Sequence, residues 1–194
     1  MRAFFGLMLV LVTAGGTFAG PLDVPGATKA LTCSACHGMA GQSLSNAMPI
    51  IAGISPAYFK KAIEDYASGK RPSPEMEPYA KMVRVMGVDD VAAYFAAQKR
   101  EPALIPVAAA AAERGRVAAA QCAICHGPDG RGDSARMIPD LRGQPPGYLK
   151  NQMLLFKADK RSPGDATLKA VKALMATIAD ATLDDLAAYF SSVR

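Results

Sequence analysis

The sequence is short of aromatic residues and of the cysteine and histidine that commonly bind metal ions. Its 194 residues include no tryptophan, and aromatic residues make up only 7% of the chain. It has four cysteines and two histidines. Two histidines are too few for a metal centre built mainly from imidazoles, so any such centre must also draw on cysteine. The formal net charge of +5 is small, and we do not interpret it as a sign of nucleic-acid binding.

All six of these residues fall in two short segments of the same pattern. The segments are Cys33-Ser34-Ala35-Cys36-His37 and Cys122-Ala123-Ile124-Cys125-His126. Cys-x-x-Cys-His is the attachment pattern of c-type haem: two thiols form thioethers with one porphyrin edge, and the imidazole approaches the iron. We therefore predict two covalently bound haem c groups. They would be attached by Cys33, Cys36, Cys122 and Cys125, with their irons bound by His37 and His126.

Three other uses of the cysteines explain the pattern less well. Two local disulfides would leave the histidine after each pair unexplained. A zinc site would need four thiolates from two distant segments, or more histidine. A thioredoxin-like redox motif would need a βαβ context, which the sequence lacks. Haem attachment is the interpretation that uses all six residues.

The N-terminus has the pattern of a secretory signal. Arg2 supplies the positive charge, an apolar run extends from Ala3 to Val12, and Thr17-Phe18-Ala19 fits a cleavage site. The alternative is an uncleaved membrane anchor, but the run is short of the roughly 20 residues that span a bilayer. We predict a cleaved signal peptide over residues 1–19. Export to the periplasm follows, because c-type haem is attached outside the cytoplasm.

An internal repeat divides the rest of the chain. The two histidines are 89 residues apart (126 − 37 = 89), and the tyrosines of the two Ala-Ala-Tyr-Phe endings, Tyr94 and Tyr189, are 95 apart (189 − 94 = 95). Three further pairs are offset by 90: Pro49 and Pro139, Tyr58 and Tyr148, and Arg71 and Arg161. We predict an N-terminal domain over residues 20–100, a linker over 101–107 and a C-terminal domain over 108–194.

Each unit is predicted to consist of helices joined by loops. Ser55-Pro56 places a capping residue before a proline at the first helical position, and Gly69 should end that helix. No segment sustains an alternation of apolar and polar residues, so we predict an all-α fold without a sheet. The expected helices begin near Gly26, Pro56, Asp89, Ala108, Pro146 and Thr182, the last with Asp185 completing a capping box.

These motifs resemble the dihaem c-type cytochromes of the cytochrome c-4 class and the related dihaem subunit of flavocytochrome c sulfide dehydrogenase. The likeness includes the Cys-x-x-Cys-His-Gly motifs, the Pro-x-x-x-Gly loops and the Ala-Ala-Tyr-Phe endings. It implies two tandem class I cytochrome c-like domains, each wrapped around one covalent haem. It also implies that the carbonyl oxygens of Pro49 and Pro139 accept hydrogen bonds from the haem histidines. The alternative is that both prolines only shape their loops.

Methionine is the expected sixth ligand of each iron, since no histidine is left over. In the first unit the resemblance places it 18 residues before the closing Tyr94, where Met76 stands (94 − 76 = 18). Met76 also follows a proline-containing loop that could pass over a porphyrin face. Met82 and Met86 lie nearer the last helix, where we expect them to pack in the core.

The second unit departs from this pattern. The position 18 before Tyr189 is Val171 (189 − 18 = 171), and Met175 is the methionine available in that segment. We predict Met175 as the ligand if residues 165–174 form a loop and the helix begins near Met175. If residues 166–178 are helical throughout, Met175 is an ordinary core residue. The remaining alternatives are Lys169, Lys172 and an open iron.

Electron transfer is the function that these features predict. The protein would be a carrier rather than an enzyme, taking electrons from a donor such as a quinol-oxidising complex and passing them to an acceptor such as a haem-copper oxidase. The second interpretation is an electron-accepting subunit of a sulfide-oxidising flavoprotein. The third is a dihaem oxidoreductase whose second iron is open. We expect redox-protein partners and no nucleic acid, and we allow for peripheral contact with a membrane.

Two haems should remain attached to each exported chain after denaturation. The reason is that thioether bonds from both cysteine pairs survive unfolding, unlike coordination bonds. Intact mass spectrometry and haem staining of denaturing gels measure this directly. Replacing Cys122 and Cys125 by alanine should lower the mass gain to that of one haem. Haem that extracts into acidified acetone would contradict covalent attachment.

Overall fold

The computed structural model describes residues 24–194, and every element in that range is helical. The predicted signal peptide, residues 1–19, lies outside the described residues. Within residues 24–194 the sole β pairing is an isolated antiparallel bridge between Asp133 and Ile138. The predicted all-α fold is therefore confirmed. None of the described helices is long and apolar enough to cross a membrane.

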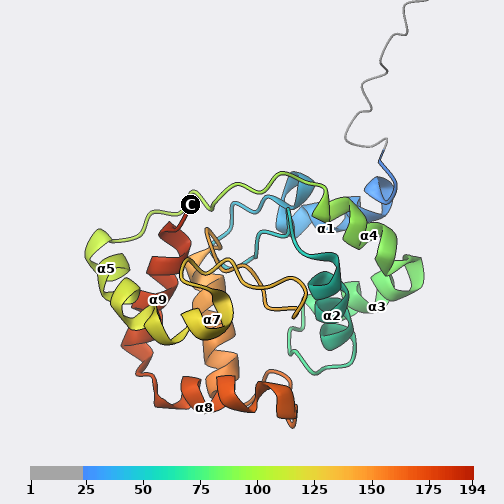
Figure 1. Ribbon diagram of the computed structural model, residues 1–194. Helices are drawn as coiled ribbons and strands as arrows, with labels where there is room; N and C mark the ends of the chain where they lie inside the picture. The colour runs from blue at the N-terminus through green and yellow to red at the C-terminus, as the bar shows by residue number, and fades with distance from the viewer. Residues whose placement is uncertain (1–23) are drawn as a thin grey trace, which may run out of the picture.

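The N-terminal half, which we define as residues 24–100, forms the right side of Figure 1. Its helix α2 packs against α3 and α4, and α1 packs against α4. Phe59, Phe95 and Val91 lie in the core between them. The elements of this half are α1 (Ala27–His37), the short 3₁₀ helix η1 (Met39–Gly41), α2 (Pro56–Ala67), α3 (Met76–Met86) and α4 (Val88–Ala96).

The C-terminal half, residues 108–194, forms the left side of Figure 1. Here α5 and α9 lie side by side, and α7 packs against α8 and α9 around Leu183 and Leu186. The elements are α5 (Ala109–Ala118), η2 (Ala119–Gln121), α6 (Ala123–His126), α7 (Pro146–Lys157), η3 (Ala166–Leu168), α8 (Lys169–Thr177) and α9 (Asp180–Ser192). Residues 101–107 carry no helix and connect the halves across the top of the figure.

Helix starts that depend on local chemistry lie where the sequence predicts them. Pro56 and Pro146 each stand in the first turn of their helices, α2 and α7. Their fixed φ suits the first turn, and their missing N–H would have no partner there in any case. Gly69, with a φ of 75°, follows the end of α2 as predicted. Helix α4 begins at Val88, one residue before the predicted start.

The predicted start of the last helix is wrong. Helix α9 begins at Asp180, so Thr182 lies inside it rather than capping it. The Asp185 carboxylate, which we expected in a capping box, instead accepts two hydrogen bonds from Arg114 of α5, at 2.7 and 2.8 Å. Asp180 places a negative charge in the first turn, where the helix dipole favours it, and also binds Lys157.

Loop segments of the two halves are joined by hydrogen bonds at their contact. The Gln144 side chain accepts from the backbone N–H of Ile50 at 3.0 Å and donates to its carbonyl at 2.7 Å. The Asn46 carbonyl accepts from the Tyr148 N–H at 2.9 Å. Ala103 of the connecting segment donates to Gly143 at 2.7 Å. Because Ile50 and Gln144 are buried, this pairing is shielded from competing water.

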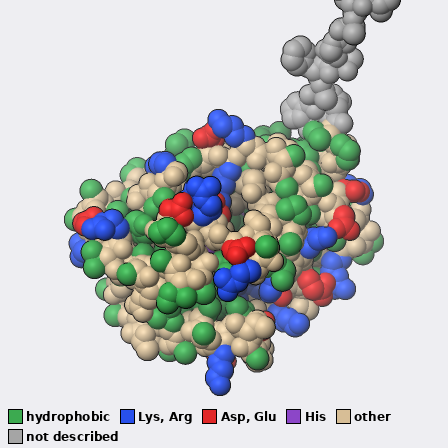
Figure 2. Space-filling view, in the orientation of Figure 1, with side chains coloured by type: hydrophobic (Ala, Val, Ile, Leu, Met, Phe, Trp, Pro, Cys, Tyr) green, Lys and Arg blue, Asp and Glu red, His purple; other side chains and the backbone are tan. Residues whose placement is uncertain are grey.

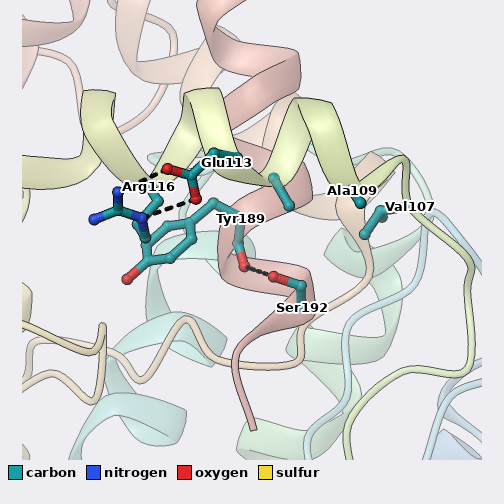
Figure 3. A pocket seen from close by; sticks show the side chains of 7 residues that line it. Val107, Ala109, Glu113, Arg116, Tyr189 and Ser192 are labelled. Carbon is teal, nitrogen blue, oxygen red and sulfur yellow. Dashed lines mark hydrogen bonds and ion pairs between the residues drawn. The ribbon is translucent and has the colours of Figure 1, made fainter.

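A close contact between two helices of the C-terminal half is made at Gly115, where α5 packs against α9. A side chain at this position would overlap the carbonyl oxygen of Asp185 and would lie 2.8 Å from Cβ of Tyr189. Figure 3 shows the same two helices, with Glu113 and Arg116 of α5 beside Tyr189 of α9. Only glycine therefore allows the two backbones to approach so closely.

Replacing Gly115 by alanine should destabilise the protein. Alanine is favoured over glycine in helices by about 1 kcal/mol, so helix propensity alone would predict stabilisation. The added methyl group forces α5 and α9 apart, however, and overpacking of this kind costs about 1–3 kcal/mol. We expect a net decrease in the free energy of unfolding, measured by denaturant titration.

Ala110→Ser is the matched control, because Ala110 is an exposed residue of the same helix and serine also adds one heavy atom. We expect it to change the free energy of unfolding by less than about 0.5 kcal/mol. A Gly115→Ala variant that is more stable than the parent protein would contradict the close packing of α5 and α9.

Candidate haem-binding sites

The first Cys-x-x-Cys-His segment occupies the end of α1. Cys33 and Cys36 are three residues apart on the helix, so both thiols lie on the same face. Cys33 is half-buried against the core of the N-terminal half, whereas Cys36 is exposed. His37 is the last residue of α1 and is 5% exposed. Gly38 ends the helix with φ 75° and ψ 168°.

The second segment has the same local geometry, although its helix is broken. The 3₁₀ helix η2 leads into the short helix α6, which ends at His126. Gly127 then adopts φ 75° and ψ 169°, nearly the angles of Gly38. Cys122 is half-buried against the core of this half and Cys125 is exposed. Each segment therefore presents one inner thiol, one outer thiol and an imidazole at a helix end.

Both histidine rings are held by the carbonyl oxygen of a proline. His37 Nδ1 lies 2.9 Å from the Pro49 oxygen, and His126 Nδ1 lies 3.0 Å from the Pro139 oxygen. A carbonyl can only accept, so Nδ1 is the protonated nitrogen and Nε2 keeps its lone pair. These are the hydrogen bonds that the resemblance implied, and they leave Nε2 of each ring able to bind a metal ion.

Burial keeps both imidazoles neutral. Removal from water lowers the pKa of His37 and of His126, and the bond to the proline carbonyl offsets only part of this effect. A neutral imidazole is the form that binds iron. The ring position, the tautomer and the charge state thus all suit metal ligation through Nε2.

The alternative uses of the cysteines find no support in the structure. No disulfide joins any of the four cysteines to another. Among residues 24–194, no group of three or more cysteine, histidine or acidic side chains is placed to hold a metal ion. Two thiols and one imidazole on a single helix end are too few ligands for zinc, but they match the covalent and axial attachment of a porphyrin.

Met76 is the first residue of α3. Its backbone N–H donates to Ser73 Oγ at 3.2 Å, which fixes the turn from the preceding loop into the helix. Its side chain is partly buried against the same core cluster that Cys33 contacts. Met76 therefore stands at the junction of loop and helix, and its role as an iron ligand stays a prediction.

The loop expected before Met175 is absent. Residues 166–177 are helical, first as η3 and then as α8, and Met175 lies in the last turn of α8 with 6% of its surface exposed. The Asp165 side chain starts this segment by accepting a hydrogen bond from Thr167 N at 2.9 Å. Lys172, one of the alternative ligands, binds the carbonyl oxygen of Ser162 at 2.5 Å.

Met175 nevertheless belongs to the core cluster that contacts Cys122, the inner thiol of the second segment. Its cluster includes Leu183 and Leu186, with Cys122 and Val171 packed against it. The structure therefore places Met175 as the alternative expectation did, inside a helix and within the core. Its role as the second sixth ligand stays a prediction, and the flanking helix is the observation that weighs against it.

The structure also brings together residues to which sequence analysis assigned no role. Two tyrosines and two arginines, paired in the repeat at an offset of 90, meet where the two halves touch. The offset of 90 residues that both pairs share within the chain was the available signal. These residues are Tyr58, Tyr148, Arg71 and Arg161.

Neither the face in Figure 2 nor the hollow in Figure 3 gathers the residue types of the two Cys-x-x-Cys-His segments. On the face shown in Figure 2, basic side chains lie interspersed with acidic ones. The open hollow shown in Figure 3 lies along α5 and α9 and contains neither a cysteine nor a histidine. Its lining residues are Val107, Ala109, Ala112, Glu113, Arg116, Tyr189 and Ser192.

Comparisons with known proteins agree with this geometry. The family model described as cytochrome c matches residues 112–194. Cytochrome c4 of Pseudomonas aeruginosa is 29% identical over 100% of this chain and 99% of its own length. A thiosulfate dehydrogenase electron acceptor of Stutzerimonas stutzeri is 35% identical over 84% of this chain and 80% of its own length. The crystal structure of reduced cytochrome c4 from Pseudomonas stutzeri superposes with a TM-score of 0.77 at 25% identity, covering 86% of this chain and 96% of that one.

Replacing Gly132 by alanine should disturb the His126 site. Gly132 has a φ of 76°, and a Cβ there would lie 2.5 Å from the Pro139 oxygen that accepts from His126. We expect the free energy of unfolding to fall by about 2–4 kcal/mol, which combines backbone strain and overpacking. The ¹⁵N chemical shift of His126 Nδ1 in the reduced protein should change as well.

Gly164→Ala separates the two contributions. Gly164 has a similar φ of 74°, but no atom lies within 4 Å of the added methyl group. This control should lose only the strain, about 1–2 kcal/mol, and leave the His126 shift unaltered. Equal losses in both variants, with no change at His126, would show that Gly132 does not position the Pro139 carbonyl.

Proposed function

The chain belongs to the dihaem c-type cytochromes related to cytochrome c4, and from this premise we propose that it carries electrons between redox proteins of the periplasm. It is an electron-transfer cytochrome with two covalently bound haem c groups. The observation that carries the proposal is the matched pair of histidines, each kept neutral by burial and oriented by a proline carbonyl so that Nε2 is free. Such a site fixes an iron ligand without offering a second group for bond-making chemistry.

The residues proposed to hold the haems follow from the two segments. The first haem would be attached by Cys33 and Cys36 with His37 as axial ligand, and the second by Cys122 and Cys125 with His126. When bound, the haem iron supplies one-electron chemistry. The chain's own residues orient the imidazoles through Pro49 and Pro139, and bury the rings so that they stay neutral. We propose Met76 and Met175 as the sixth ligands.

The periplasm is the proposed location for two reasons. Residues 1–19 have the pattern of a cleaved secretory signal. Covalent haem attachment also takes place outside the cytoplasm, so a protein with two Cys-x-x-Cys-His segments must be exported before it is complete.

The proposed electron donor is an enzyme that oxidises inorganic sulfur compounds. This proposal comes from the relative at 35% identity, whose name makes it the electron acceptor of a thiosulfate dehydrogenase. It refines the earlier interpretation of the chain as a partner of a sulfide-oxidising flavoprotein. In both cases the electron donor is an enzyme that oxidises an inorganic sulfur compound. Transfer from a quinol-oxidising complex to a haem-copper oxidase is the alternative, and it is the one that the resemblance to the cytochrome c-4 class implies.

Reduction by thiosulfate tests the proposal. The oxidised protein is mixed with thiosulfate, with and without a catalytic amount of a thiosulfate dehydrogenase, and haem absorbance is followed. We expect both haems to be reduced when the dehydrogenase is present and neither to be reduced by thiosulfate alone. No reduction with the enzyme would exclude this donor, and catalytic thiosulfate oxidation by the chain alone would make it an enzyme.

Removing the two proposed methionine ligands should affect the oxidised spectrum equally. A sulfur-to-iron bond gives a charge-transfer band in the far red, so Met76→Ala and Met175→Ala should each remove about half of it. Met153→Ala is the control for lost packing, because Met153 is a partly buried neighbour in the same core as Met175. It should leave the band intact.

Loss of the whole band in Met76→Ala, with no change in Met175→Ala, would mean that the second iron has no methionine ligand. Met175 lies inside α8, and this position is the observation that favours such an outcome. The second iron would then be open or bound by a lysine, and the oxidoreductase interpretation would replace that of a simple carrier.

A further inference from the structure

The two proline loops that hold the histidines have the same backbone arrangement. In each loop the residue two places after the proline donates to a glycine carbonyl, and the glycine four places after the proline donates to a phenylalanine carbonyl of the closing helix. The bonds are Ile51 to Gly41 and Leu141 to Gly130, both at 2.9 Å, and Gly53 to Phe95 and Gly143 to Phe190, both at 2.8 Å. Because the loops share one backbone, a difference between the two histidine sites must come from side chains.

The side chains of the two loops differ in charge. In the first loop Ile50 and Ala52 are buried and apolar. At the matching positions of the second loop stand Asp140 and Arg142 (50 + 90 = 140, 52 + 90 = 142). A carboxylate therefore comes directly after the proline that binds the second histidine, whereas an aliphatic side chain comes after the proline that binds the first.

The Asp140 carboxylate is held in one orientation. The backbone N–H and Nε of Arg142 donate to its Oδ1 at 2.9 and 3.0 Å, and Nη2 of Arg142 donates to its Oδ2 at 2.7 Å. Nη1 of Arg100 lies 3.4 Å from the same Oδ2. The three side chains are between 18% and 26% exposed, so water screens these charges less than it screens a fully exposed ion pair.

The charge of Asp140 acts on the second histidine. Burial lowers the pKa of His126, and the Pro139 carbonyl and Asp140 both raise it. At His37 burial lowers the pKa and the Pro49 carbonyl raises it, and these are the two influences on that ring. Asp140 thus favours positive charge at the second imidazole, in addition to the hydrogen bond that both imidazoles make.

A fixed carboxylate favours the more positive of two oxidation states. A ferric iron carries one positive charge more than a ferrous iron, so a nearby anion attracts it more strongly. Groups that surround an axial histidine tune the iron that it binds. By this argument Asp140 stabilises the oxidised second haem, while the uncharged Ile50 gives the first haem no such effect.

We propose that Asp140 lowers the midpoint potential of the second haem relative to the first, and that Arg142 and Arg100 limit this effect by partly neutralising the carboxylate. The inference rests on the two covalent haems of the proposed function and deepens it, because it makes the two haems unequal. Electrons move toward the higher potential, so the carboxylate favours transfer from the second haem to the first. Asp140 is not a ligand, and it acts on the iron through His126.

Removing the charge of Asp140 tests the proposal. The potential of each haem in the loaded protein is measured by redox titration followed by proton NMR, with the haem methyl signals assigned to their own half. In Asp140→Asn we expect the ratio of reduced to oxidised second haem at a fixed ambient potential to rise by about 3- to 10-fold. The first haem should not change. Asp140→Glu keeps the charge and should stay close to the parent protein.

Removing the neutralising cation should have the opposite effect. Arg142→Gln should lower the same ratio, and because Arg142 also lies 3.8 Å from Asp129, a second carboxylate is freed that acts in the same direction. The double variant Asp140→Asn/Arg142→Gln should fall between the two single variants. Damage to the loop would instead act in one direction in both single variants and grow in the double variant, so the signs separate charge from loss of structure.

Asp184→Asn is the matched control. Asp184 lies in the same half and pairs with Lys150 at 2.7 Å, but its side chain is 57% exposed. The same chemical change there should leave both potentials within error of the parent protein. In Asp140→Asn the Nδ1–H proton of His126 should stay protected from exchange, because the Pro139 carbonyl still accepts from it.

Two results would overturn the proposal. One is an Asp140→Asn protein that retains both haems and shows either no change or an equal change in the two potentials. The other is a shift of the second haem in the same direction in Asp140→Asn and Arg142→Gln, together with loss of protection at His126 Nδ1–H. Asp140 would then be a structural brace of the loop and not a source of charge.

The proposed function is checked separately in the same samples. Haem content is measured by intact mass, and a chain that binds fewer than two haems would contradict the function itself. Reduction in the presence of a thiosulfate dehydrogenase is recorded for each variant, and its failure in a protein with two haems would exclude that donor alone. Neither result depends on how the two potentials differ.

Discussion

Each half of the chain is arranged around one hydrogen bond, from a histidine Nδ1 to the carbonyl oxygen of a proline 12 or 13 residues later. For that bond to form, the helix must end at the histidine, and the chain must turn back toward the ring. Gly38 and Gly127 end their helices with nearly the same backbone angles, which a residue with a side chain would adopt only at a cost. The end of the helix, the glycine and the proline loop therefore act together to position a neutral imidazole.

The same loops join the two halves. Pro49 directly precedes Ile50, whose N–H and carbonyl are both bound by Gln144 of the other half. Displacing one half relative to the other would move this loop and with it the acceptor of His37. The geometry of the first histidine is thus coupled to the contact between halves, through a chain of two hydrogen bonds and one peptide unit.

Local structure follows from the sequence where a single residue type has a local consequence. Prolines mark the starts of α2 and α7, because their φ is fixed before folding. The spacing of the cysteines and the histidine likewise indicates the cofactor, because the haem attachment pattern is confined to five consecutive residues. The start of α9 was mispredicted because Asp185 is engaged by Arg114, a partner 71 residues away. Of the two alternatives stated for the segment before Met175, the helix is the one that forms, and the Asp165 side chain caps its start. The repeat offset marked Arg71 and Arg161 as equivalent, but only tertiary contact shows that each reaches into the opposite half.

The crossed arginine–tyrosine pairs give the contact between the two halves the form of an isologous interface. In an exchange of this kind, each unit lends its arginine to the tyrosine of the other, which is the arrangement of a symmetric homodimer. Gln152 breaks this symmetry, because the matching position in the first unit is Ala62 (152 − 90 = 62). One half alone supplies the amide oxygen that both arginines bind, so two identical copies of either unit would not reproduce this contact.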